Sequence, residues 1–150
     1  MKIRIATCED VNQITALIIP FIDEFAVDNN GRQLFSAEII QRLVENSEVN
    51  YFVYENSHKI IGVIAYKKPA HLVHFFISKA YQGQGIGRTM WNFILDKVQQ
   101  TEALVFTVNS SCNAQMVYEK FGFIVQGQTI ENHGLRYVPM SFDLSSKSLN

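Results

Sequence analysis

The sequence predicts an α+β (mixed α/β) domain, with a mixed, mostly antiparallel sheet of about seven strands and about four flanking helices. Three observations support this. Nearly half of the 150 residues are apolar, and they fall into short runs of strand length and stretches with helical spacing. Turn residues separate these segments at short intervals. Residues 71–108 follow the order strand, helix, strand, which predicts a parallel pair. We expect a single domain over residues 1–144, with residues 145–150 as a disordered tail.

The first third of the chain predicts one strand and two helices. Residues 2–6 alternate polar and apolar side chains, as in a half-buried strand. Thr7 can cap a helix whose apolar face continues until Pro20 interrupts it. Ser36 can cap a second amphipathic helix, and the Asp-Asn-Asn-Gly sequence at residues 28–31 predicts a loop between the two helices.

The middle of the chain predicts a three-stranded antiparallel meander followed by a β-α-β unit. Residues 50–55 and 59–67 have the length and turn chemistry of a hairpin, and residues 71–77 form the third strand. Residues 87–100 show apolar side chains at helical spacing. Residues 103–108 are almost wholly apolar, which predicts a strand that is buried on both faces and parallel to residues 71–77.

The last third predicts a short helix and two strands. Residues 113–121 have helical spacing, and Gly122 is suited to end that helix. Residues 123–130 and 136–144 then read as two strands joined around Asn132-His133-Gly134.

Composition excludes several classes of function. The formal net charge of −1 gives no electrostatic reason to expect nucleic acid or a membrane surface as partner. No apolar run approaches the ~18 residues of a membrane span, and the N-terminus lacks the apolar core of a signal peptide. Cys8 and Cys112 lack metal-ligand spacing, so we expect no metal site and favour two reduced thiols in a cytoplasmic chain over a disulfide.

The most informative stretch is Gln82-Gly83-Gln84-Gly85-Ile86-Gly87-Arg88, between a predicted strand and a predicted helix. Glycines at alternate positions let successive N–H groups converge at the positive end of the helix, which suits phosphate or pyrophosphate. The dinucleotide pattern fails because Arg88 stands where a glycine is needed, and the P-loop pattern fails at Arg88-Thr89. A purely structural glycine turn is the alternative.

The spacing Gln82-x-x-Gly85-x-Gly87 resembles the Q/R-x-x-G-x-G/A signature of the GNAT (Gcn5-related N-acetyltransferase) superfamily. The resemblance covers about residues 2–144. At its end, residues 137–144 look like the family's closing strand. A second stretch resembles the family's N-x-x-x-N-x-x-x-x-Y-E-K-x-G-F motif, at Asn109, Asn113, Ala114, Tyr118, Glu119, Lys120, Phe121, Gly122 and Phe123.

The resemblance implies a GNAT-like fold in which the two parallel strands start paired and splay apart, with acetyl-CoA as co-substrate in the gap. Its cofactor contacts carry over to Phe75, Phe76 and Ile77 for the pantetheine arm and to Asn109 and Asn113 beside it. The pyrophosphate contacts carry over to Gln82, Gly83, Gln84, Gly85, Ile86, Gly87 and Arg88. For Asn113, a helix N-cap is an equal alternative, and the residue could serve both purposes.

The implied reaction is acyl transfer from a thioester to an amine, which needs an oxyanion donor, an acid and a base. The resemblance assigns the Ile77 N–H as oxyanion donor and Tyr118 as the acid for the leaving thiolate, with a core tyrosine as the alternative. His71 stands where several members of the family place a catalytic glutamate. It shares the face of Ile77 if no bulge intervenes, and an ordinary strand histidine is the alternative. By the same parity His74 points to the other face, as a structural residue.

The acceptor is expected to be a small-molecule amine or a peptide or protein amine. Asp23, Glu24 and Asp28 lie where the family's first two helices line the acceptor side, and a solvated helix face is the alternative. Cys112 could suggest an acyl-cysteine route, but the family transfers directly within a ternary complex. A non-catalytic acyl-CoA sensor or subunit is the competing function. A homodimer is included among the expected partners, because members of the family often dimerise.

Overall fold

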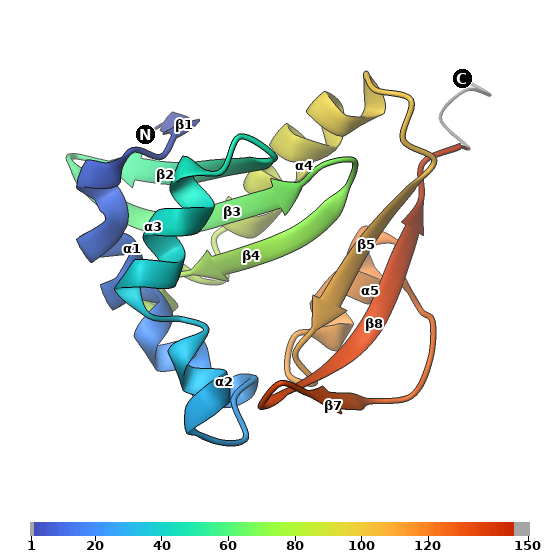
Figure 1. Ribbon diagram of the computed structural model, residues 1–150. Helices are drawn as coiled ribbons and strands as arrows, with labels where there is room; N and C mark the ends of the chain where they lie inside the picture. Colours follow the sequence, from blue (N-terminus) through green and yellow to red (C-terminus); the bar gives the residue numbers. More distant parts are fainter. Residues whose placement is uncertain (1, 146–150) are drawn as a thin grey trace.

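The computed structural model describes residues 2–145, and the predicted disordered tail lies almost wholly outside them. Figure 1 shows helices on both faces of one twisted sheet. The elements, in which η marks a 3₁₀ helix, are β1 (Lys2–Ile5), η1 (Cys8–Asp10), α1 (Val11–Ile18), η2 (Ile19–Glu24), α2 (Asn29–Gln33), α3 (Ala37–Glu45), β2 (Val49–Asn56), β3 (Lys59–Lys67), β4 (His71–Ile77), η3 (Lys79–Tyr81), α4 (Ile86–Gln99), β5 (Val105–Ser110), α5 (Gln115–Phe121), β6 (Ile124–Val125), β7 (Ile130–Asn132) and β8 (Leu135–Asp143).

The sheet is mixed and mostly antiparallel, which confirms the predicted fold class. Its eight strands follow the order β1-β2-β3-β4-β5-β8-β6, with β7 paired to β8 beside this path. The predicted meander is present as β2, β3 and β4, and β4 and β5 are the parallel pair. The described residues contain one strand and one α-helix more than the approximate numbers that the sequence predicts.

The extra strand arises because residues 123–130 do not form one strand, as predicted, but two short ones. β6 pairs with Ser141 and Met140 of β8, and β7 pairs with residues 135–137. Between them stands Pro139, whose carbonyl accepts the Gln126 N–H at 2.8 Å. In an antiparallel ladder the N–H and C=O of one residue face the same neighbouring strand. The Pro139 carbonyl faces residues 124–132, so the N–H that proline lacks is missing on that side of β8. The partner strand breaks at that point.

The extra helix is α2, where the prediction of a loop at residues 28–31 is wrong. Asp28 has extended backbone geometry, and its side chain accepts the Gly31 N–H at 3.0 Å, which makes it an N-cap. Gly31 packs so closely on Gly134 that a Cβ at Gly31 would overlap the Gly134 carbonyl. The Asp-x-x-Gly sequence is typical of a turn, but here it starts a helix. Its aspartate caps the helix, and its glycine is required for close packing.

The prediction that residues 103–108 form a strand buried on both faces is also wrong. β5 runs from Val105 to Ser110 and alternates: Phe106 and Val108 are buried, whereas Val105 is 47% exposed. Helices α1 and α3 pack on β2, β3 and β4, so this face of β5 has no helix over it (Figure 1). Because the predicted strand is almost wholly apolar, its sequence does not indicate that only one face of β5 is buried.

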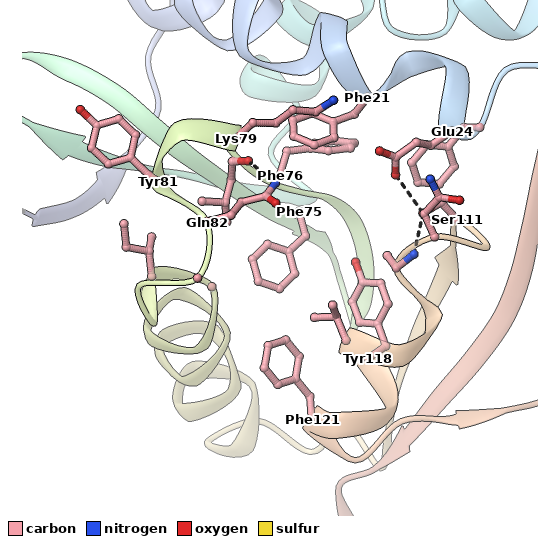
Figure 2. A pocket seen from close by; sticks show the side chains of 18 residues that line it. Phe21, Glu24, Phe75, Phe76, Lys79, Tyr81, Gln82, Ser111, Tyr118 and Phe121 are labelled. Carbon is pink, nitrogen blue, oxygen red and sulfur yellow. Dashed lines mark hydrogen bonds between the residues drawn. The ribbon is translucent and has the colours of Figure 1, made fainter.

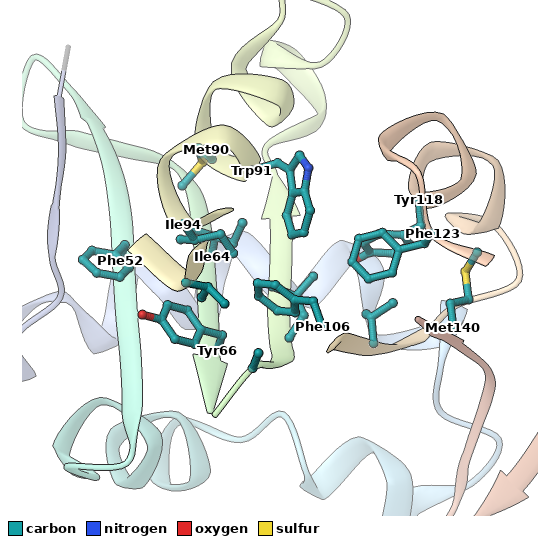
Figure 3. Close-up of a cluster of buried hydrophobic side chains, with 14 of the residues drawn as sticks. Phe52, Ile64, Tyr66, Met90, Trp91, Ile94, Phe106, Tyr118, Phe123 and Met140 are labelled. Atoms are coloured by element: carbon teal, nitrogen blue, oxygen red, sulfur yellow. The ribbon is translucent and has the colours of Figure 1, made fainter. Parts of the chain in front are cut away.

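Two apolar clusters lie on the two faces of the sheet. The first is centred on Trp91 of α4, which contacts the rings of Phe106 and Phe123 (Figure 3). Trp91 also contacts the rings of Phe121 and Phe142. The second packs α1 and α3 against β2, β3 and β4 and contains the buried Ile14, Ile18, Ile40, Val53 and Val63.

The parallel pair β4 and β5 stays together only at one end. The register joins His71 to Thr107 and Leu72 to Val108, and no later residue of β4 is paired with β5 in the described chain. In Figure 1 the two strands diverge from this point. The result is a gap within the sheet, with β1 to β4 on one side and β5 to β8 on the other.

The start of the chain is held by a charged network around Arg4. Its guanidinium donates to both oxygens of Asp10 at 2.8 and 2.9 Å and also pairs with Glu55 at 3.2 Å. Asp10 is buried, and it also accepts the Thr7 N–H at 2.8 Å as part of a capping box. The hydrogen bonds from Arg4 hold the pKa of the Asp10 carboxyl below its usual value of 3.8, although burial opposes them.

Because the pKa of Asp10 is lowered by folding, its contribution to stability is fully present above pH ~4 and is lost as the pH falls through the folded-state pKa. We expect Asp10→Asn to lower the free energy of unfolding at pH 7 by about 1–3 kcal/mol, since it removes charged hydrogen bonds from a buried site. The difference from wild type should shrink below pH 4. Urea unfolding followed by the fluorescence of Trp91 measures both values.

Glu38→Gln is the matched control for Asp10→Asn. Glu38 forms an exposed i,i+4 pair with Arg42, so its loss should change stability by less than about 0.5 kcal/mol. A deficit in Asp10→Asn that is equal at pH 7 and pH 3 would contradict the proposed charge linkage.

Candidate active site

A cavity of about 440 Å³ occupies the gap between β4 and β5. Figure 2 shows aromatic side chains around it, with the glycine loop at one end and Glu24 and Ser111 at the other. Its walls come from η2, the end of β4, the glycine loop with the start of α4, and α5 with the loop before it. The lining residues are Phe21, Glu24, Phe25, Phe75, Phe76, Ile77, Lys79, Tyr81, Gln82, Gly83, Ile86, Gly87, Ser111, Asn113, Ala114, Val117, Tyr118 and Phe121.

The main chain of β4 turns hydrogen-bonding groups toward this cavity. The Ser78 N–H donates to the Ile61 carbonyl at 2.8 Å, so residues 61 and 78 form a hydrogen-bonded pair between β3 and β4. Pairs in an antiparallel ladder alternate, so Phe75 and Ile77 direct their N–H and C=O groups away from β3 and toward the gap. The Ile77 carbonyl accepts the Gln82 side-chain amide at 3.0 Å.

The glycine loop ends at the start of α4 and leaves helix N–H groups free. Gly83 and Gly85 have φ of +77° and +83°, which favours glycine, and a Cβ at either position would meet open space. Gly85 is the N-cap of α4 and has no side chain to cap it. The first N–H groups of the 14-residue helix therefore face outward at its positive end, which suits an anion.

Tyr118 of α5 forms the wall of the cavity opposite β4. Its side chain is 6% exposed and packs edge-on against Phe75 and Phe123, with ring centroids 6.2 and 5.4 Å apart. No hydrogen bond from its hydroxyl to another described residue is found, and in Figure 2 the hydroxyl points into the cavity. Burial raises the pKa of the Tyr118 phenol well above its usual value of 10.0, so it is protonated at neutral pH and can donate a proton.

The residues predicted from sequence to bind the cofactor fall into two groups. Phe75, Phe76, Ile77, Gln82, Gly83, Ile86, Gly87 and Asn113 line the cavity. Gln84, Gly85 and Arg88 belong to the same loop and helix start but do not form its wall, and the Arg88 guanidinium lies 5.0 Å over the Phe121 ring. Asn109 is exposed on β5, on the opposite face from the buried Val108, and does not line the cavity.

Asn113 is not the N-cap of the following helix, so that alternative is wrong. α5 begins at Gln115, and the residue before it, Ala114, donates its N–H to the Ser111 hydroxyl at 3.1 Å. Ser111 therefore supports the start of the helix, and the exposed Asn113 faces the cavity.

The expectation that His71 shares a face with Ile77 is wrong, because a bulge intervenes. Ala65 pairs with His74 and Tyr66 with Leu72, so Val73 is an extra residue in β4. Leu72 and Ile77 both pack in the first apolar cluster, which turns His71 to the other face. His71 lies at the paired end of β4, where its Nδ1 is 2.7 Å from the Thr107 hydroxyl, and does not line the cavity. Its role as base stays a prediction that this placement disfavours.

His74 is a buried histidine of the second cluster. Its Nδ1 lies 2.8 Å from the Tyr51 hydroxyl, and its ring stacks on Phe35. Burial lowers the pKa of His74 to about 4, so the ring is neutral at pH 7. These contacts agree with the structural role expected for this residue.

The three carboxylates predicted on the acceptor side have different surroundings. Asp28 caps α2, and the exposed Asp23 pairs with Arg32 at 3.0 Å. Glu24 alone lines the cavity, where it accepts the Ser111 hydroxyl at 3.4 Å. A polar depression continues from this end and is lined by Pro20, Asp23, Glu24, Lys79, Cys112, Asn113 and Arg136.

Sequence reasoning missed Phe21, Phe25, Lys79 and Ser111 as lining residues. The phenylalanines lie in residues 21–32, whose pattern fits neither a regular helix nor a strand. A Phe-x-x-x-Phe spacing beside Glu24 was the available signal. Nothing in the sequence joins Ser111 to Glu24, because 87 residues separate them.

Among residues 2–145 no group of three or more His, Cys, Asp or Glu side chains could hold a metal ion. Within the same residues no helix has the length and apolar character needed to cross a membrane.

Comparison with known families agrees with this geometry. The model of a family described as an acetyltransferase (GNAT) domain matches residues 22–144. The chain therefore belongs to the GNAT acetyltransferase family.

Solved structures share the fold at low sequence identity. A GCN5-related N-acetyltransferase from Rhodopseudomonas palustris has a TM-score of 0.80 and 18% identity, over 95% of this chain and 94% of that one. The PaiA N-acetyltransferase of Thermoplasma acidophilum, solved in complex with coenzyme A, has a TM-score of 0.77 and 16% identity, over 95% and 98%. An aminoglycoside 6'-N-acetyltransferase complexed with coenzyme A has a TM-score of 0.74 and 12% identity, over 96% and 97%.

Proposed function

We propose that this protein is an N-acetyltransferase that moves the acetyl group of acetyl-CoA to a primary amine by direct attack in a ternary complex. One observation carries the proposal. A single cavity combines the unpaired main-chain edge of β4, the open N-terminus of α4 and the hydroxyl of Tyr118. These groups match the amides, the diphosphate and the leaving thiol that such a reaction brings together.

The chain offers a suitable partner for each part of coenzyme A. The N–H groups from Gln82 to Arg88 would hold the diphosphate, because Gly83 and Gly85 leave the space beside the main chain open. The N–H and C=O groups of Phe75 would pair with the amides of the pantetheine arm as a neighbouring strand would. The coenzyme A complexes of two proteins with this fold support this assignment.

Acetyl-CoA supplies an activated acyl group in the form of a thioester. The Ile77 N–H faces the gap, so we assign it as the donor to the carbonyl oxygen that gains negative charge during attack. Tyr118 is protonated at neutral pH and points into the same cavity, so we assign it as the acid that protonates the departing sulfur. The apolar walls of the cavity limit access of water, which would compete with the amine.

The competing function is a GNAT module that binds acyl-CoA without turnover. Such a sensor needs the glycine loop but has no use for a tyrosine hydroxyl that points into the cavity (Figure 2), and Tyr118 therefore favours the enzyme. Release of free thiol from acetyl-CoA across a panel of primary amines tests the proposal. Thiol release that no amine accelerates, together with tight binding of acetyl-CoA, would favour the sensor.

We also propose that the protein acts in the cytoplasm. Cys8 and Cys112 are both exposed free thiols, which suits a reducing compartment.

One prediction from the proposed function concerns Gly85. An L-residue at φ of +83° is strained by about 1–3 kcal/mol, and its Cβ would project into the space assigned to the diphosphate. Gly85→Ala should therefore weaken coenzyme A binding by about tenfold or more, measured by isothermal titration calorimetry. Gly127→Ala is the control, since its Cβ would make only an ordinary contact with Pro139 at 3.8 Å. Equal affinities in the two variants would place the diphosphate elsewhere.

Another prediction concerns Tyr118. Tyr118→Phe keeps the ring contacts with Phe75 and Phe123 but removes the proton donor, so turnover should fall by ~10²–10⁴-fold while coenzyme A affinity stays the same. Steady-state thiol release and calorimetry measure the two quantities. The control is Tyr66→Phe, which removes the hydroxyl of another buried tyrosine, outside the cavity. Full turnover in Tyr118→Phe would remove this residue from the mechanism.

A further inference from the structure

The proposed reaction leaves one requirement unassigned. A primary amine arrives at neutral pH as an ammonium ion, and it must lose a proton before it can attack. His71 does not line the cavity. Among the described residues that do line it, Glu24 carries the only carboxylate.

Glu24 lies at the end of the cavity that is opposite the glycine loop (Figure 2). The glycine loop and the face of β4 that carries Phe75 and Ile77 pack with the first apolar cluster, on the α4 side of the sheet. Phe21, Phe25 and Phe76, which line the same cavity as Glu24, belong to the second cluster, on the α1 side. The cavity therefore passes through the gap in the sheet, and Glu24 occupies the side that the assigned coenzyme site leaves open.

The main chain and side chain of Glu24 are both anchored. The carbonyl of the next residue, Phe25, accepts the Arg136 N–H at 2.7 Å, which fixes η2 to β8. The carboxylate accepts the hydroxyl of Ser111, a residue that is 1% exposed and that also receives the Ala114 N–H. Ser111 thus connects Glu24 to the start of α5, the helix that carries Tyr118.

The surroundings also indicate which amines fit. The rings of Phe21 and Phe76 lie 5.3 Å apart and those of Phe25 and Phe76 lie 6.2 Å apart, so the wall beside Glu24 is aromatic. An apolar carbon chain next to the nitrogen gains contact area with these rings, whereas a second ammonium or several hydroxyl groups placed against the same rings would lose water.

We propose that Glu24 with Phe21, Phe25 and Phe76 forms the acceptor site, and that its substrate is a primary amine on an alkyl or arylalkyl chain. This inference rests on the proposed function. The Glu24 carboxylate pairs with the ammonium and takes one proton from it. The neutral nitrogen then forms the N–C bond as the C–S bond breaks. The sulfur takes the Tyr118 proton, and the second proton lost by nitrogen restores Tyr118.

The test uses 2-phenylethylamine as the probe and Glu24→Gln as the isosteric neutral variant. Binding of the probe to the protein saturated with coenzyme A, which cannot react, is measured by calorimetry. Turnover is measured as kcat with acetyl-CoA at saturating probe. We expect about 10- to 100-fold weaker binding and at least about tenfold lower kcat in Glu24→Gln, with unchanged coenzyme A affinity as evidence of a native fold.

Asp23→Asn is the matched control, because it neutralises the adjacent carboxylate, which is exposed, pairs with Arg32 and does not line the cavity. Its binding and kcat should remain within about twofold of wild type. Glu24→Asp, which keeps the charge, should recover part of both losses, and spermidine should be a poorer acceptor than the probe. A Glu24→Gln variant that binds the probe as tightly as Asp23→Asn overturns the proposal. Where wild type turns the probe over, a Glu24→Gln variant with the kcat of Asp23→Asn also overturns it, and so does a preference for spermidine.

The binding measurement separates this inference from the proposed function. Wild-type protein that binds the probe through Glu24 but releases no thiol would contradict the proposed catalysis and leave the acceptor site supported. Thiol release that is equally fast in wild type and Glu24→Gln would contradict the acceptor site and leave the proposed catalysis supported.

Discussion

The site depends on one irregular strand. Val73 is an extra residue in β4, so the alternation of side chains between the two faces of the sheet is interrupted there. β4 is paired with β5 only before that point, at His71 and Leu72. Beyond the bulge, Phe75 and Ile77 have main-chain groups with no partner strand, a state that is costly in a protein interior. A ligand with amides of its own can satisfy these groups, which makes the unpaired edge a binding surface.

Packing on both sides of the gap prevents the two halves of the sheet from closing. On the α4 side, Phe121 of α5 stacks on Trp91 and lies nearly parallel to Phe75, so aromatic rings pack along the space between the diverging strands. On the α1 side, Ala26 forms a bridge with Leu135, and the close contact of Gly31 with Gly134 holds α2 on the turn before β8. The separation of β4 from β5 is therefore built into the core, and the cavity does not require a ligand to hold it open.

Much of this arrangement could be predicted from sequence, and the failures have physical causes. The hairpin, the limits of β4 and the strand–loop–helix order around Gly85 follow from local periodicity and turn chemistry. Local patterns do not reveal that Val73 is a bulge, because a bulge is a property of the pairing between two strands. For the same reason the face of His71, the one-sided burial of β5 and the break opposite Pro139 could not be predicted. The neighbours that decide each of them are distant in the sequence.

The division of the core into two clusters gives the two substrates of the proposed reaction a place to meet. A closed sheet would separate the α4 side from the α1 side, and a group bound on one side could not reach the other. The gap between β4 and β5 is where the cavity connects them, with residues of both clusters in its wall. In the proposed reaction the coenzyme and the amine thus approach from opposite faces of the sheet. They meet at Ile77 and Tyr118, where the neighbouring side chains are largely aromatic. This geometry favours transfer within a ternary complex, because both substrates can be bound at once and neither blocks the path of the other.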